Sequence, residues 1–291
     1  MTPRRTPGRT PGAVPGSGLI GLVLAGGAPR VGVEPFFMEL IAGMEAQLRP
    51  QGRSVLLLVV ADVADEVATY RRWAQHGTVE AVVVVNLTAG DVRPGALRGI
   101  GLPTVLAGHH PDEGFASVLT DDAGAMRTAL RLLSSHGHRV IGRVAGPGDL
   151  VHTRERTAAM LEEAERSGLE IRLVEADYTG PRGAAAAREL LAAADPPTAL
   201  VFDNDVMAVA ALEDLVHRGV DVPGRVSLLA CDDSALCELA VPALSALSPD
   251  VHEHGVRLGR AVLDLLLRGR TGPQPGPPVR FVERSSTGPL S

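Results

Sequence analysis

This 291-residue chain contains polar and aromatic residues suited to holding a small molecule. A sugar-like ligand needs charged and amide groups that hydrogen-bond its hydroxyls, and a flat apolar surface for its less polar face. Arg156, Asp232 and Asn204 offer the first, and Phe36 and Phe37 offer the second. Each of these follows the end of an expected strand or opens an expected helix, which predicts one binding site for a small polar ligand. Two further candidates are Asp121 and Asp149.

Each polar candidate also has a purely structural explanation. Arg156 lies on a polar helix, where an arginine is usually solvated. Asn204 and Asp205 stand where a helix begins, so capping explains at least one of them. We expect Asp205 to belong to the helix start and Asn204 to face the ligand. Asp232 and Asp233 end a strand, where acidic loop residues are common.

The adjacent aromatic residues Phe36 and Phe37 stand at the start of an expected helix. Neighbouring positions on a helix point in different directions. We therefore expect one ring to pack into the core and the other to line the site.

Signals of catalysis, cofactor or metal binding are poor in this sequence. The chain contains no lysine, so it cannot form the phosphate-binding loop that ends in Lys, and it lacks the Gly-x-Ser-x-Gly motif of hydrolases. His252 and His254 lie two positions apart on an expected helix and face different sides of it. His109 and His110 lie in an expected loop. We expect no enzyme, no cofactor and no metal site.

A repeat organises the elements that carry these residues. The stretch Ile20-Gly21-Leu22-Val23-Leu24-Ala25-Gly26 is echoed by Ile141-Gly142-Arg143-Val144-Ala145-Gly146, and each begins a strand, a helix and a second strand. Strands and helices then alternate along the whole chain. This pattern predicts an α/β protein with two doubly wound, Rossmann-like lobes of parallel sheet, joined by crossover strands and separated by a ligand cleft.

The expected elements have the following bounds. Strands are predicted over 19–25, 54–60, 81–85, 104–107, 117–120, 140–145, 170–175, 199–202, 226–231 and 279–283. Helices are predicted over 35–48, 66–75, 125–135, 152–167, 181–193, 205–218 and 252–267. The domains are predicted as a disordered leader over 1–18, an N-terminal lobe over 19–138 plus 249–276, and a C-terminal lobe over 139–248 plus 277–291.

Composition favours a soluble cytoplasmic protein. The hydrophobic content of 45% suffices for two cores, and the longest apolar runs, 55–61 and 81–85, are far shorter than a membrane helix. The leader lacks the apolar core of a secretory signal. Cys231 and Cys237 are the only cysteines, and we expect both to be reduced. The net charge of −6 argues against a non-specific nucleic-acid binder.

Several stretches in order carry a family resemblance over residues 19–288. They are Pro35-Phe36-Phe37, Gly137-His138-Arg139-Val140-Ile141, Ala145-Gly146-Pro147-Gly148-Asp149, Phe202-Asp203-Asn204-Asp205-Val206-Met207-Ala208, Val222-Pro223-Gly224-Arg225-Val226-Ser227, Asp232-Asp233 and Glu283-Arg284-Ser285-Ser286-Thr287-Gly288. The sequence resembles the effector-binding region of the lactose-repressor (LacI) family of transcription regulators. The resemblance implies a ligand-sensing role, a homodimer, and ligand contacts by Arg156 and Asp232.

The sequence also departs from the family pattern. The leader is too short for the family's helix-turn-helix headpiece, so we expect DNA contact only through a headpiece that these 291 residues lack. Glu34, Ala159-Met160 and Ala230-Cys231 differ from the usual residues beside the cleft. The expected partner is a small effector, a sugar or a nucleoside-like compound. The alternatives are a solute-binding protein for transport and a doubly wound enzyme.

Overall fold

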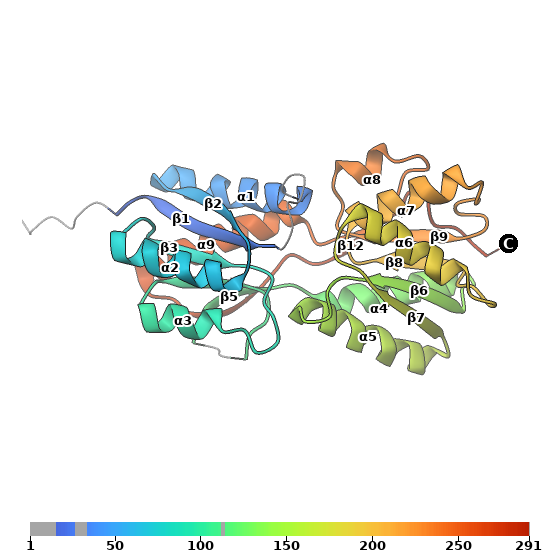
Figure 1. Ribbon diagram of the computed structural model, residues 1–291, viewed down its shortest axis with the longest axis horizontal. Helices are drawn as coiled ribbons and strands as arrows, with labels where there is room; N and C mark the ends of the chain where they lie inside the picture. The colour runs from blue at the N-terminus through green and yellow to red at the C-terminus, as the bar shows by residue number, and fades with distance from the viewer. Residues whose placement is uncertain (1–15, 27–33, 112–113, 291) are drawn as a thin grey trace, which may run out of the picture.

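The computed structural model describes residues 16–26, 34–111 and 114–290, which form two α/β lobes (Figure 1). The predicted leader lies mostly outside the described residues. Among those described, no helix combines the length and the apolar character that crossing a bilayer requires.

The N-terminal lobe is built on a six-stranded sheet in the order β11-β5-β4-β3-β1-β2, parallel throughout. Its strands are β1 (Leu19–Ala25), β2 (Ser54–Val60), β3 (Ala81–Val84), β4 (Thr104–Ala107), β5 (Ala116–Leu119) and β11 (Gly272–Pro275). Its helices are α1 (Pro35–Leu48), α2 (Val63–His76), α3 (Arg93–Ile100) and α9 (Val251–Arg268), with a short 3₁₀ turn, η1 (Arg49–Gln51). One apolar cluster lies under α1 and α9, and another lies under α2 and α3.

The C-terminal lobe repeats the arrangement with the sheet order β12-β10-β9-β8-β6-β7, in which only β12 is antiparallel. Its strands are β6 (Val140–Ala145), β7 (Glu170–Glu175), β8 (Ala199–Phe202), β9 (Ser227–Cys231), β10 (Ser245–Ser248) and β12 (Arg280–Val282). Its helices are α4 (Asp122–Ser135), α5 (Val151–Ser167), α6 (Gly180–Leu191), α7 (Asp205–His217) and α8 (Ala235–Leu239). The structure thus confirms two doubly wound lobes.

The predicted lobe boundary after residue 138 is displaced in the structure. The sequence predicts α4 in the N-terminal lobe, but its residues Met126, Leu130 and Leu133 are buried with Ile141 of β6 in a cluster of the C-terminal lobe. Because α4 presents this apolar face to α5 and the second sheet, the chain leaves the first lobe at residues 120–121. It crosses again at 249–250 and at 276–279.

Helices α1 and α9 pack with their backbones almost in contact. A Cβ added at Gly43 would lie 2.0 Å from the carbonyl oxygen of His252, and one added at Gly255 would lie 2.1 Å from that of Leu40. Any larger residue would push the helices apart. This contact fixes α9, and with it the crossover at 249–250, against the first helix of the chain.

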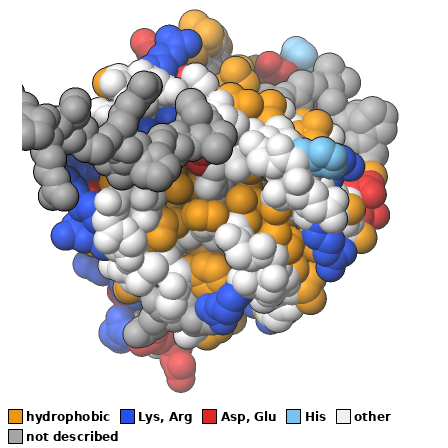
Figure 2. All heavy atoms as spheres, turned by 90° about the vertical axis from the view of Figure 1, so that its left-hand side faces the viewer, with side chains coloured by type: hydrophobic (Ala, Val, Ile, Leu, Met, Phe, Trp, Pro, Cys, Tyr) orange, Lys and Arg blue, Asp and Glu red, His pale blue; other side chains and the backbone are white. Residues whose placement is uncertain are grey.

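The outer end of the N-terminal lobe is remote from the junction of the lobes. Figure 2 shows arginine side chains scattered around that face, with apolar and neutral surface between them. The carboxyl ends of the strands, where doubly wound sheets bind ligands, face the other lobe instead.

Candidate ligand-binding cleft

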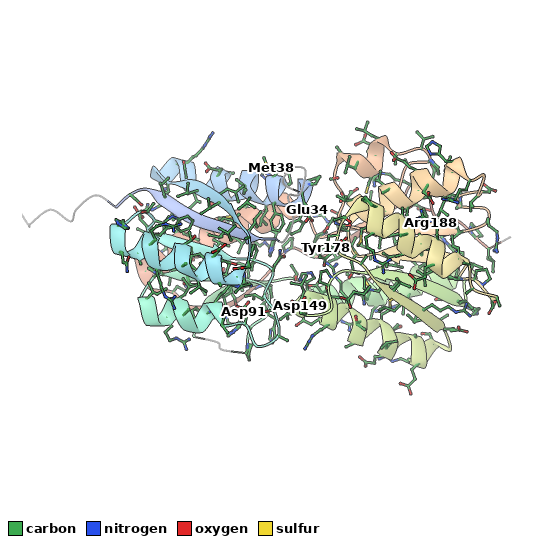
Figure 3. All side chains as sticks on the ribbon, viewed as in Figure 1. Glu34, Met38, Asp91, Asp149, Tyr178 and Arg188 are labelled. Carbon is green, nitrogen blue, oxygen red and sulfur yellow. The ribbon has the colours of Figure 1, made fainter. Side chains whose placement is uncertain are left out.

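A cleft with about 1120 Å³ of space, part of it open to solvent, lies between the two lobes. Residues that follow β3, β4 and β5 form one wall, and residues that follow β7, β8 and β9 form the other. In each sheet the strand order reverses beside the first strand, and the cleft lies at these switch points. Figure 3 shows Glu34 and Tyr178 between the lobes, and both line the cleft.

Arg156, on α5, lines the cleft and is already engaged by the protein on one side. Its Nε donates to Asp122 Oδ1 at 2.7 Å, and its Nη1 donates to the carbonyl oxygen of Asp203 at 2.9 Å. Burial lowers the pKa of Arg156, but the carboxylate of Asp122 more than offsets it and raises that pKa above its ordinary value. Nη2 makes no hydrogen bond to any described residue, which leaves a charged donor for a ligand.

Asp232 follows β9 and lines the same cleft. Its carboxylate accepts no hydrogen bond within the described part of the chain, although its side chain is half-buried. Burial raises the pKa of Asp232 to about 8, and the negative charges of Asp205, Glu34 and Asp122 add to that effect against the opposing charge of Arg156. This carboxyl group is therefore poised to donate or accept a hydrogen bond near neutral pH.

Asp205 is the first residue of α7, as expected, but the capping role at this helix start belongs to Asn204. Asn204 is the N-cap of α7: its side-chain oxygen accepts from the backbone N–H of Met207 at 2.9 Å, and its amide nitrogen donates to the carbonyl oxygen of Tyr178 at 3.2 Å. Asp205 instead accepts from the N–H of Ser234 at 3.0 Å. Asn204 does line the cleft, but the backbone at the start of α7 occupies its side-chain oxygen. A ligand contact through its side-chain amide nitrogen therefore stays a prediction.

Phe36 and Phe37 both line the cleft, with ring centroids 5.3 Å apart and planes at 87°. Phe37 is also part of the N-terminal core, whereas Phe36 is half-buried and only packs against that core. Phe37 is therefore the ring that packs into the core, as expected, but both rings line the cleft, whereas only one was expected to.

The two further candidates lie in different places. Asp121 lines the cleft, but its carboxylate caps α4 by accepting from the N–H of Gly124 at 2.9 Å. Asp149 has an exposed side chain and does not line the cleft. It lies at the lower rim of the junction between lobes (Figure 3), where its carbonyl oxygen accepts from the N–H of Ala89 at 3.0 Å.

Comparison with known proteins decides the family. Residues 130–287 match the periplasmic binding protein-like domain. The transcriptional regulator CelR of Thermobifida fusca is 30% identical over 261 residues, which cover 87% of this chain and 76% of CelR. A LacI-family regulator from Bifidobacterium animalis subsp. lactis is 33% identical with a TM-score of 0.85, covering 94% of this chain and 99% of that one. The chain belongs to the LacI family of transcriptional regulators.

A third relative is a solved structure of a CelR–cellobiose complex, 28% identical with a TM-score of 0.83, covering 92% of this chain and 84% of that one. The relatives are regulators, and the described lobes are the effector-binding region of a LacI-family protein. Within the described part of the chain, no group of three or more His, Cys, Asp or Glu side chains is arranged to hold a metal ion.

Three cleft residues of this LacI-family chain are not among the candidates expected from the sequence: Asp122, His152 and Tyr178. Asp122 opens α4 and pairs with Arg156. His152 Nε2 and Tyr178 Oη lie 2.7 Å apart, and burial, together with the charge of Arg156, lowers the pKa of His152 to about 4. The doublet Asp121-Asp122 after an expected strand was one available signal, since the second acid stands where a helix begins.

A buried ion pair supports the C-terminal wall of the cleft. Arg143, in the middle of β6, donates from Nε and Nη2 to the two carboxylate oxygens of Asp203 at 2.9 and 2.8 Å. Asp203 also accepts from the N–H of Gly146 at 2.9 Å. Burial raises the pKa of Asp203, but Arg143 and Arg156 more than offset it and hold that pKa below its ordinary value.

Backbone strain is concentrated at the cleft. In the described chain, four residues other than glycine adopt positive φ angles: Asn86, Tyr178, Asp232 and Asp250. The first three line the cleft, and Asp250 lies in a crossover between lobes. Asn and Asp adopt left-handed backbone more readily than other residues, whereas a tyrosine such as Tyr178 keeps it only where the surrounding structure imposes it, often at ligand sites.

Proposed function

We propose that this chain senses a small polar effector, a sugar or a nucleoside-like compound, which binds between the lobes and contacts Arg156 and Asp232. One observation carries the proposal. Nη2 of Arg156 and the carboxylate of Asp232 line one cleft, and neither has a hydrogen-bond partner among the described residues. Phe36 supplies apolar surface in the same space. The cellobiose bound to the related CelR favours a sugar.

The fold supplies a way to transmit binding. The lobes are joined by crossovers at 120–121, 249–250 and 276–279, and a ligand that contacts both walls favours one angle between them. We propose that this change of angle is the regulatory signal. The effector can shift the equilibrium between the two interlobe angles only by the difference between its affinities for them.

We further propose that two copies of the chain associate side by side. Exposed apolar side chains occur on both lobes: Met38 of α1 and Val59 of β2 are 55% and 60% exposed, and Leu239 of α8 and the following Val241 are 76% and 83% exposed. Helices α1 and α8 lie along the same upper side of the molecule in Figure 1, and Met38 is labelled there in Figure 3. A second copy covering this side would bury all of them.

Calorimetric titration with uncharged sugars and nucleosides tests the binding proposal. Removing a charged hydrogen-bond partner from a buried site costs roughly 1.5–3 kcal/mol, so Arg156→Ala and Asp232→Ala are each expected to weaken binding by about tenfold to a hundredfold or more. Asp149→Ala is the matched control, since its side chain is exposed outside the cleft. Unchanged affinity in both cleft variants would remove Arg156 and Asp232 from the site.

A further inference from the structure

The cleft carries many more carboxylates than cations. Six carboxyl groups line it, and among the described lining residues Arg156 is the one arginine. The carboxyl groups belong to Glu34, Asp121, Asp122, Glu155, Asp203 and Asp232. The charge that a ligand meets depends on which of these groups the protein itself neutralises.

Two of the six carboxylates are matched within the protein. Arg143, 0% exposed, binds both oxygens of Asp203, and Arg156 forms an ion pair with Asp122 at 2.7 Å. The positive charge of Arg156 is therefore largely offset before any ligand arrives. An anionic ligand that approached Arg156 would also approach Asp122.

The histidines with lowered pKa values do not restore the balance. Burial, first of all, lowers the pKa of both His152 and His254 to about 4, so both are neutral at physiological pH. His254 is 3% exposed and lines the cleft, and its Nδ1 has no hydrogen-bond partner among the described residues. It adds polar hydrogen-bonding capacity to the cleft wall without adding positive charge.

Glu155 and Asp232 are two lining carboxyl groups that no described side chain neutralises, and Asp232, whose pKa burial raises to about 8, becomes negatively charged only as the pH rises toward that value. Within the described chain, neither side chain accepts a hydrogen bond or forms an ion pair, and both are half-buried at the cleft surface. Burial raises the pKa of Glu155, and repulsion by Asp122 raises it further against the opposing effect of His109, which also lines the cleft. Glu155 directly precedes Arg156 on α5, so both enter the cleft from the same turn of helix.

We propose that the cleft selects its ligand by charge: it accepts an uncharged or amine-bearing sugar or nucleoside and rejects one that carries a phosphate or carboxylate. Glu155 and Asp232 set this preference, because a ligand anion would lie beside the charge of Glu155, and beside that of Asp232 once it is ionised, in a site where water screens charge poorly. An amine would instead pair with them. The inference rests on the proposed function, whose site it describes further.

Inorganic phosphate is the first probe, because its use requires no knowledge of the effector. Calorimetry at about pH 9, where Asp232 with its pKa of about 8 is mostly ionised, is expected to give no saturable phosphate binding to the full wild-type chain at millimolar concentrations. The double variant Glu155→Gln, Asp232→Asn keeps Arg156 and the cleft shape, and is expected to gain saturable binding at least about tenfold tighter than the wild-type limit. Glu165→Gln is the matched control, because this exposed residue lies on α5 outside the cleft.

Saturable phosphate binding to the wild-type cleft would overturn the proposal. Absence of any gain in the double variant would overturn the assignment to Glu155 and Asp232. The single variant Glu155→Gln, with a circular dichroism melt, provides the same comparison if the double variant does not fold.

Matched ligands then separate this inference from the proposed function. Glucose, glucosamine and glucose 6-phosphate form one series, and ribose and ribose 5-phosphate form another. Binding by a phosphate ester as tight as that of its parent sugar would overturn charge selection and leave the proposed function standing. Binding by none of the uncharged or amine compounds would count against the proposed function, while the phosphate titration still decides the charge preference.

Discussion

Some polar side chains of the cleft are already hydrogen-bonded within the protein, and others are left for a ligand. Asn204 and Asp121 use their side-chain oxygens to cap helices, and Asp122 holds Arg156. Asp232 has no such task in the described chain. Residue type and position after a strand predicted all of these except Asp122, but could not separate the two groups, because the partners come from distant segments.

The raised pKa of Asp232 predicts a stability effect. Its folded-state pKa of about 8 lies above the ordinary 3.8, so the folded protein holds a proton that the unfolded chain releases. Stability is therefore lost as pH rises from about 4 to 8. Asp232→Asn is expected to be neutral near pH 4 and to stabilise the protein by about 1–2 kcal/mol near pH 8, less than the full shift because water reaches the carboxylate.

Thermal melts across this pH range check that expectation. Asp233→Asn is the matched control, since Asp233 accepts from Arg284 at 2.7 Å and its replacement loses an ion pair. If Asp232→Asn raises the melting temperature equally at pH 4 and pH 8, the pKa of this carboxyl group is not raised in the folded protein.

The ion pair between Arg143 and Asp203 predicts a large effect of a single substitution. Both side chains are fully buried, so Arg143→Met leaves an unpaired carboxylate in the core. Such a change costs about 3–5 kcal/mol. Urea unfolding is expected to show this loss, and the double variant Arg143→Met, Asp203→Leu should recover part of it. Equal loss in the single and double variants would assign the cost to packing alone.

At the scale of elements, an interlobe clasp formed by residues 87–89 and 149–151 fastens one rim of the cleft. Ala89 N–H donates to the Asp149 carbonyl at 3.0 Å, and Val151 N–H donates to the Leu87 carbonyl at 2.8 Å. Val151, on α5 of the C-terminal lobe, packs against the core of the N-terminal lobe. The residue just before the first segment of the clasp is itself held, since buried Arg93 donates to the carbonyl oxygen of Asn86 at 2.7 Å.

Loosening the interlobe clasp is expected to expose Cys231, which lines the cleft. Burial raises the pKa of its thiol to about 12, so alkylation of the native protein should be slow. Val151→Ser removes apolar contact worth about 1 kcal/mol, and the labelling rate of Cys231 should rise several-fold. Mass spectrometry identifies the labelled thiol. The control is Val216→Ser, because Val216 is exposed on α7. An equal rise in the labelling rate of both variants, or no rise in either variant, would contradict the clasp.

The sequence did not predict helices α3 and α8 or strands β10 and β11, and two of these, α3 and β11, consist of residues with weak local preference. Helix α3 contains one proline and two glycines, and the buried pairing of Arg93 with Glu66 and Asp91 holds its first turn. Strand β11 has the sequence Gly-Pro-Gln-Pro and forms only at the edge of a sheet, beside β5. Tertiary contacts create both, whereas the long amphipathic helices and apolar strands follow from their own patterns.

At the scale of the whole molecule, the two-lobed fold was predictable because each half repeats one alternating pattern. The lobe to which α4 belongs was not, since the amphipathic pattern of a helix reports that it has a buried face but not which sheet covers that face. How two copies of the chain associate is harder still to predict from the sequence. It depends on exposed side chains of elements far apart in the chain, such as α1 and α8.

The proposed association predicts a change in oligomeric state on substitution of Leu239. This side chain is 76% exposed on α8, and a second copy that covers it would desolvate any charge placed there. Leu239→Glu is expected to raise the dimer dissociation constant at least about thirtyfold, as for the loss of a central interface residue worth about 2 kcal/mol. Leu161→Glu is the matched control, because Leu161 is 52% exposed on α5, along the opposite side of the lobe in Figure 1. Sedimentation velocity at micromolar concentration should give a dimer for the wild type and Leu161→Glu, and a monomer for Leu239→Glu; a monomeric wild type would refute the association itself.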